Sequence, residues 1–166
     1  MREMQKNLLL HGRILWRADG AMGLSWSFSG CSFCFEGDAL TIFCAPYPTE
    51  EYLAVIVDGV TYKMRVCDRF SLALKNGSHT VSLRRASAES WSETVFVTAI
   101  TVDGTFAAPP VEKQRKLEFI GDSITCGYGI LAGPTEPYRT STEDATVNYA
   151  ARMAQMLDAR DLSAVF

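Results

Sequence analysis

Residues 52–66 read Tyr-Leu-Ala-Val-Ile-Val-Asp-Gly-Val-Thr-Tyr-Lys-Met-Arg-Val, two β-prone apolar runs on either side of Asp58-Gly59. An Asp-Gly pair between such runs indicates a two-residue hairpin, because a type I′ turn needs positive φ at both central positions. Outward from this hairpin, residues 12–106 repeat the pattern of short runs separated by turn residues, with no helical period. Nine short strands are expected, and they predict an all-β jelly roll or β-sandwich over residues 1–108.

The sequence changes character after this region. Residues 109–114, which begin with two prolines, are expected to form a linker. Beyond it, we expect an apolar strand at Leu117–Ile120, an amphipathic helix at Val147–Leu157 and a second strand at Leu162–Phe166. This order predicts that residues 115–166 form the first β-α-β unit of a truncated, flavodoxin-like α/β domain.

An isolated β-α-β unit leaves apolar surface uncovered. Parallel sheets are normally covered on both faces, and a single helix covers only one of them. An open sheet edge and an apolar patch invite pairing with another chain. We therefore expect self-association through the incomplete C-terminal sheet, or its burial against a complementing polypeptide.

The composition excludes several classes of partner. The chain has 166 residues, a net charge of −3, 48% hydrophobic and 21% charged residues, which is ordinary for a globular protein and gives no footprint for nucleic acid. No apolar run reaches the length of a membrane span, and Leu8-Leu9-Leu10 is too short for the core of a signal peptide. A cytoplasmic location is therefore expected, or a secreted one if a leader has been trimmed.

The five cysteines are expected to be reduced and mostly buried. Cys31 and Cys34 form a C-x-x-C pair, a spacing that also occurs in metal and redox sites. On a strand, however, an offset of three places the two side chains on opposite faces, and no second cysteine or histidine pair completes a zinc site. We expect neither a metal nor a cofactor.

The chemistry is predicted to lie at residues 116–129, Lys-Leu-Glu-Phe-Ile-Gly-Asp-Ser-Ile-Thr-Cys-Gly-Tyr-Gly. The apolar run ends abruptly at Gly121-Asp122-Ser123, and two more glycines follow. A strand that stops on a small turn presents its next side chain at the carboxyl edge of a sheet, where ligands bind in open α/β sheets. Ser123 is therefore the candidate nucleophile, and it needs a base and an oxyanion hole.

The stretch Gly121-Asp122-Ser123-Ile124-Thr125 resembles the first signature block of the SGNH (GDSL-type) serine esterases. The longer run from Phe119 to Gly129 resembles carbohydrate esterase family 2, acetylxylan-esterase-like enzymes in which a β-sandwich precedes the esterase domain. The resemblance implies a metal-independent hydrolase that deacetylates a carbohydrate or similar small ester through an acyl-Ser123 intermediate. It also implies that the Ser123 backbone N–H donates to the oxyanion, while Gly121 and Asp122 support the turn.

The same resemblance identifies what these 166 residues do not contain. The family carries its general base in an Asp-x-x-His motif, and the sequence has none; His11 and His79 are expected to be structural. A serine without its base is a poor nucleophile, so we expect little esterase activity from the chain alone. Trp91 is the candidate for a further substrate contact, by stacking on a sugar ring.

Two alternative functions are compatible with the missing base. The chain could be a non-catalytic β-sandwich module that binds carbohydrate or a protein partner, in which case Ser123 would be dispensable. It could instead assemble with the missing half of the esterase as a separate polypeptide.

Overall fold

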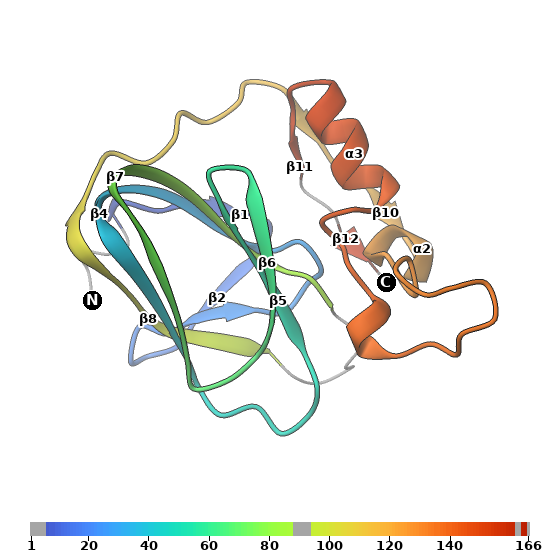
Figure 1. The fold of residues 1–166 in the computed structure, drawn as a ribbon. Helices are drawn as coiled ribbons and strands as arrows, with labels where there is room; N and C mark the ends of the chain where they lie inside the picture. Colours follow the sequence, from blue (N-terminus) through green and yellow to red (C-terminus); the bar gives the residue numbers. More distant parts are fainter. Residues whose placement is uncertain (1–5, 88–93, 162–163, 166) are drawn as a thin grey trace.

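The computed structural model describes residues 6–87, 94–161 and 164–165. Its main feature is one eight-stranded antiparallel sheet, with strand order β2-β3-β8-β4-β7-β5-β6 and with β1 paired to β4 (Figure 1). The strands are β1 (Leu9–His11), β2 (Ile14–Trp16), β3 (Met22–Leu24), β4 (Gly30–Cys44), β5 (Tyr52–Val57), β6 (Val60–Arg65), β7 (Arg69–Arg85) and β8 (Val95–Phe106).

The hairpin predicted at Asp58-Gly59 is confirmed. β5 and β6 pair antiparallel with Val57 opposite Val60, and Asp58 and Gly59 have φ values of 50° and 84°. Both central residues are thus left-handed, as a type I′ turn requires. The turn is fastened to β7, because Asp58 Oδ1 accepts a hydrogen bond from the Thr80 N–H at 2.8 Å.

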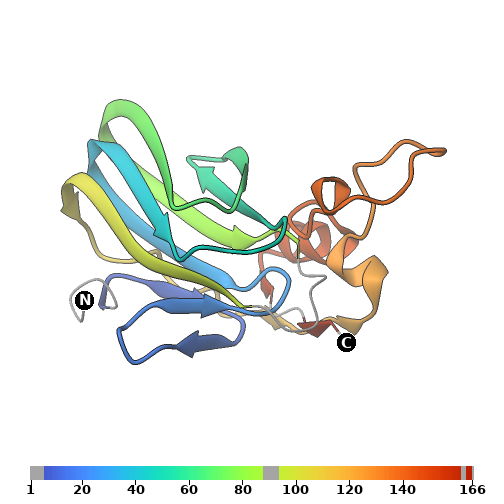
Figure 2. The same cartoon turned by 90° about the horizontal axis from the view of Figure 1, so that it is seen from below.

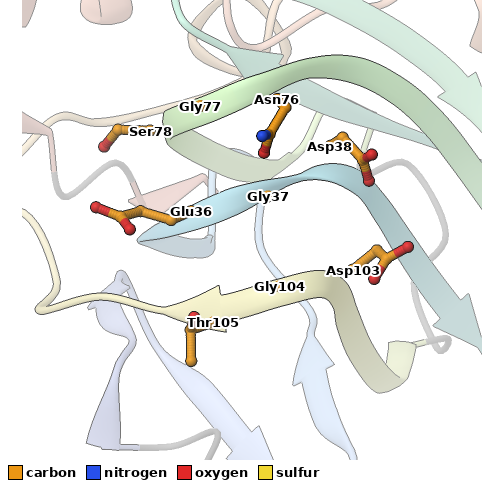
Figure 3. Close-up of a pocket in the computed structure, with 9 residues that line it drawn as sticks. All are labelled: Glu36, Gly37, Asp38, Asn76, Gly77, Ser78, Asp103, Gly104 and Thr105. Carbon is orange, nitrogen blue, oxygen red and sulfur yellow. The ribbon is translucent and has the colours of Figure 1, made fainter.

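Among the turn residues that were expected to separate short strands in residues 12–106 are Glu36-Gly37-Asp38 and residues 75–78, and at these two places the expectation is wrong. β4 and β7 run through both stretches as single long strands, which bend there instead of reversing (Figure 2). Gly37 is the partner of Gly77 on one side and of Gly104 on the other, so three glycines lie side by side (Figure 3). A Cβ on Gly37 would lie 2.0 Å from a carbonyl oxygen of β8, so this close approach requires glycine.

The bend also keeps one face of β4 in the core. Before the bend the odd-numbered Phe33 and Phe35 are buried, and after it the even-numbered Leu40 and Ile42 are buried. Between Gly37 and Ala39 the register of β4 against β8 shifts, because two steps along β4 stand opposite a single step along β8, and this extra residue of β4 changes the alternation by one. The hydrophobic side chains of β3 to β8 therefore join one core cluster.

A buried ion pair lies at the end of β7. Arg85 Nη2 and Glu51 Oε1 are 3.2 Å apart, and the two side chains are 0% and 2% exposed. Arg85 also donates from Nε to the Ser87 carbonyl and from Nη1 to the Leu24 carbonyl, each at 2.8 Å. The Ser87 hydroxyl donates to Glu51 Oε2 at 2.6 Å. Because buried charges need partners of this kind, the cluster fixes β7 against β3 and the start of β5.

A second buried cation clamps the bend of β7. His79 is 8% exposed; its Nδ1 lies 2.6 Å from Asp58 Oδ2 and its Nε2 lies 2.8 Å from the Lys75 carbonyl oxygen. Both partners are acceptors, so the ring satisfies both contacts only when both nitrogens carry protons. The hydrogen bond to Asp58 raises the pKa of His79, and the same bond lowers the pKa of Asp58.

This clamp predicts that the protein is less stable in alkaline solution. A raised histidine pKa contributes stability fully below the ordinary value of 6.5, and the contribution is lost as pH rises through the folded pKa. A lowered aspartate pKa contributes above 3.8 and is lost as pH falls through the folded pKa. Burial lowers the pKa of His11 to about 2, so that ring costs stability below pH 6.5, and the comparison is made above this value. We expect calorimetry to give a higher Tm at about pH 7 than at about pH 9. His79→Gln should remove most of that difference, and an unchanged difference in the variant would contradict the assignment.

The α/β fold class predicted for residues 115–166 is wrong. Within its described residues, this part forms no α/β unit but two parallel pairs of two residues each, β9 with β11 and β10 with β12 (Figure 1). Its elements are β9 (Lys116–Leu117), β10 (Ile120–Gly121), α2 (Ser123–Cys126), the 3₁₀ helix η1 (Thr140–Thr142), α3 (Tyr149–Met156), β11 (Arg160–Asp161) and β12 (Ala164–Val165). The fold class is therefore corrected from a jelly roll followed by an α/β domain to a predominantly antiparallel β fold.

Local contacts explain this difference. The predicted strand at Leu117–Ile120 breaks because Phe119 turns edge-on to Tyr149, with ring centroids 5.9 Å apart, and Ile120 stays 68% exposed. Parallel strands are normally packed against other elements on both faces, and the exposed Ile120 has no such packing. The helix begins only at Tyr149 because Asn148 caps it, with Oδ1 accepting from the Ala151 N–H at 2.8 Å. The division into residues 1–108, 109–114 and 115–166 stays a prediction.

Candidate active site

Ser123 opens the one-turn helix α2, which is hydrogen-bonded at both ends. At its start Asp122 is the N-cap, and its Oδ1 accepts from the Ile124 N–H at 3.0 Å. At its end Gly127 has a φ of 84°, and the Tyr128 N–H donates to the Ser123 carbonyl at 2.9 Å, the bond that closes a Schellman motif. The backbone of Ser123 is thus fixed from both sides.

Two glycines allow α2 to pack closely against its surroundings. A Cβ on Gly121 would lie 2.1 Å from Thr125 Oγ1, and one on Gly127 would lie 2.4 Å from the Asp144 carbonyl oxygen. Asp144 is buried, and its N–H donates back to the Gly127 carbonyl at 3.2 Å. Both glycines are therefore required by packing, and Gly127 by its left-handed backbone as well.

The Ser123 side chain is exposed, and its hydroxyl has no hydrogen-bond partner in the described ranges. Its backbone N–H is also unpaired within this part of the chain, as is usual for the first N–H groups of a helix. No described histidine is available as its base. His11 Nε2 lies 2.9 Å from Ser32 Oγ, both nitrogens of His79 are bonded in the sheet, and burial beside two arginines lowers the pKa of His11 to about 2.

A stacked pair of tyrosines follows α2 in the chain. The rings of Tyr128 and Tyr138 are parallel within 5°, with centroids 3.7 Å apart. Tyr138 is anchored from behind, because its hydroxyl donates to Glu143 Oε2 at 2.8 Å and Glu143 is fully buried. Lys63 Nζ of β6 donates to the Glu143 carbonyl at 2.5 Å. The loop that follows α2 is therefore joined to the large sheet through Lys63, and burial lowers the pKa of that amine.

The first turn of α3 completes the surroundings of α2. Asn148 Nδ2 donates to the Thr125 carbonyl while its Oδ1 caps α3, so one buried side chain joins the two helices. Thr125 Oγ1 lies 2.9 Å from the Tyr149 hydroxyl oxygen. These contacts hold α2 rigidly although it has only one turn.

The structure gathers some of the predicted site residues and adds others. Gly121, Asp122 and Ser123 form one continuous turn, whereas Trp91 lies outside the described residues. The Tyr128–Tyr138 pair was not among the predicted site residues. Its only signal was the tyrosine between two glycines at residues 127–129, and nothing in the pattern relates that tyrosine to one ten residues later in an irregular loop.

A separate hollow of about 670 Å³ lies where β4, β7 and β8 bend (Figure 3). Its floor is the row of three glycines, and its rim carries Glu36, Asp38, Asn76 and Asp103. The hollow follows from the close approach of the three strands and contains none of the predicted site residues.

The described part of the chain contains neither a metal-binding cluster nor a membrane-spanning helix. No group of three or more His, Cys, Asp or Glu side chains is arranged to hold a metal ion. None of the described helices is long and apolar enough to cross a membrane.

In a comparison with protein families, the model described as carbohydrate esterase 2 N-terminal matches residues 10–110. The chain is 27% identical over 164 residues to the cellulase/esterase CelE of Acetivibrio thermocellus, an alignment that covers 95% of this chain and 20% of the relative. It is 36% identical over 86 residues to the acetylxylan esterase / glucomannan deacetylase of Cellvibrio japonicus, covering 51% of this chain and 24% of that protein.

Solved structures give the same result over nearly the whole chain. A family two carbohydrate esterase from Clostridium thermocellum, solved in complex with cellohexaose, superposes with a TM-score of 0.82 at 27% identity. The match covers 95% of this chain and 50% of the esterase chain. The present chain thus spans about half the length of this solved relative and a fifth to a quarter of the two curated ones.

Proposed function

Because the chain belongs to the carbohydrate esterase 2 N-terminal family, we propose that it supplies the nucleophile of a serine esterase that removes acetyl groups from carbohydrates. The observation that carries this proposal is Ser123, whose free hydroxyl stands exposed at the start of a helix capped at both ends. The relatives' names, acetylxylan esterase and family two carbohydrate esterase, support the substrate class.

In the proposed reaction, Ser123 Oγ bonds to the acetyl carbonyl carbon while a base removes its proton. The negative charge on the carbonyl oxygen is stabilised by N–H donors, to which the unpaired Ser123 N–H contributes one. The bond to the sugar oxygen then breaks, and that oxygen takes the proton. Water hydrolyses acetyl-Ser123 to acetate. We assign the base and the remaining donors to the half of the relatives that this chain does not match.

The test is a fusion in which this chain is followed by the unmatched half of the C. thermocellum esterase. Acetate release from acetylated xylo-oligosaccharides is expected from the fusion, and a fluorophosphonate should label Ser123. The chain assayed alone should give no more than trace turnover, because it lacks a base. A fusion that folds but releases no acetate and is not labelled would disprove the proposal.

The self-association predicted above runs through the incomplete C-terminal sheet, and the outer face of α3 offers a second surface for it. Ala150, Ala151 and Ala154 are buried on the inner face, while Met153 and Met156 are 45% and 85% exposed on the outer one. Large apolar side chains that are exposed on the outer face of a helix are typical of a surface that a partner covers. We propose that a second copy of the chain covers this outer face.

Sedimentation velocity tests this interface. The wild-type chain is expected to dimerise at micromolar concentration, and a Met153→Glu, Met156→Glu double variant should be monomeric, because the two carboxylates cannot be buried unpaired. Arg65→Glu, an exposed change of the same net charge on β6, is the control for added charge. A wild-type chain that remains monomeric would refute the interface.

A further inference from the structure

The stacked pair of tyrosines carries an inference that deepens the proposed function and rests on it. We propose that the free face of Tyr128 is a subsite for a sugar ring of the carbohydrate whose acetyl group reaches Ser123. The ligand class is a pyranose, bound by stacking of its C–H face on an aromatic ring.

Tyr128 is covered by a stacked ring on one face and is still partly exposed, and we infer that its other face is open. Tyr138 covers the other face at 3.7 Å and a 5° interplanar angle, yet Tyr128 remains 43% exposed. An aromatic ring covered on one side only, with its hydroxyl at the edge, offers an apolar face and a polar rim. A pyranose has the same two chemistries, C–H groups on its faces and hydroxyls around its edge.

The position of Tyr128 is fixed before any ligand arrives. Its N–H donates to the Ser123 carbonyl at 2.9 Å, so its backbone lies one helical turn from the candidate nucleophile. Its ring is backed by Tyr138, whose hydroxyl bonds to the buried Glu143. Such a supported ring loses little conformational freedom on binding, so more of the stacking energy appears as affinity.

The segment that carries Tyr128 exposes further apolar side chains. Ile124, Ile130 and Leu131 are 70%, 43% and 51% exposed, and they come from the same segment as Ser123 and Tyr128. The Leu131 N–H donates to the Thr142 carbonyl at 2.9 Å, so this segment is tied to the chain near η1. Apolar side chains exposed along one segment suit a ligand that has apolar faces.

The test is binding of xylohexaose and cellohexaose to the 166-residue chain, followed by saturation-transfer NMR and titration. Wild type and Tyr128→Phe should bind equally, because stacking needs the ring and not the hydroxyl. Tyr128→Leu should weaken binding by roughly 10-fold, which corresponds to the loss of one stacked ring. Tyr138→Leu should weaken it less, by removing the support.

Melting curves establish that each variant is folded, and Tyr128→Ala, which also removes the ring, takes the place of Tyr128→Leu if Leu is poorly tolerated. Equal binding by wild type and Tyr128→Leu would overturn the subsite, and so would the absence of binding by the wild-type chain at millimolar sugar. Fluorophosphonate labelling of Ser123 in the fusion tests the esterase separately. Sugar binding that depends on Tyr128 without a reactive serine would leave the subsite standing and disprove the esterase.

Discussion

Replacing Arg85 by methionine is expected to lower the free energy of unfolding by about 3–5 kcal/mol. The substitution keeps most of the volume but removes the charge that faces Glu51, which is buried and has no route to solvent in the folded protein. The carbonyls of Leu24 and Ser87 lose their donors at the same time. Since the free energy of unfolding of such domains is about 5–15 kcal/mol, the substitution should remove a large part of it.

Urea denaturation measures this loss directly, as a lower midpoint with an unchanged slope. Arg17→Met is the matched control, because Arg17 pairs with Asp19 at the surface, where both side chains are partly exposed. That variant should change the midpoint little. The double change Arg85→Met with Glu51→Leu should recover part of the stability, since apolar replacements of a whole buried pair are often nearly neutral. Equal effects of Arg85→Met and Arg17→Met would show that the buried pair is unimportant.

Features of the fold that depend on residues adjacent in the sequence could be predicted from the sequence. The Asp58-Gly59 hairpin was predictable because two adjacent residues determine the turn type. Glu36-Gly37-Asp38 has the same composition as a turn, yet it is a bend in a long strand. What decides between the two is the alignment of Gly37 with Gly77 and Gly104, a contact across three strands that no local pattern contains.

The same limit explains the C-terminal part and the site. The order strand, helix, strand suggested a continuous parallel sheet, but only two pairs of two residues each form. The length of a parallel pair depends on packing against both faces of its strands, and the sequence pattern does not contain that information. The turn at Asp122-Ser123 was found because a short motif carries it. The ring that stacks on Tyr128 comes from an irregular loop, where neither a helical nor a strand period relates one residue to another.

Replacing Ser123 by alanine in the fusion is expected to lower kcat/KM for acetyl release by roughly 10⁴- to 10⁶-fold. The change removes only one oxygen from an exposed side chain that bonds to no described residue, so α2 and its caps should be unaffected. Binding of the sugar should persist, because the Tyr128–Tyr138 pair does not depend on the hydroxyl. The loss should therefore appear in kcat with little change in KM, as expected for a group that acts only in the transition state.

Initial rates of acetate release from acetylated xylo-oligosaccharides provide the measurement, with Ser78→Ala as the control for loss of an exposed hydroxyl on the sheet. The control should keep full activity. A small effect of Ser123→Ala would mean that another group attacks the ester, and Ser123 would then be only the first residue of a well-capped turn. A large effect confined to kcat would instead identify the exposed hydroxyl as the nucleophile. The two caps of α2 would then serve to hold that oxygen still, because a displaced nucleophile loses much of the advantage of being bound next to the ester.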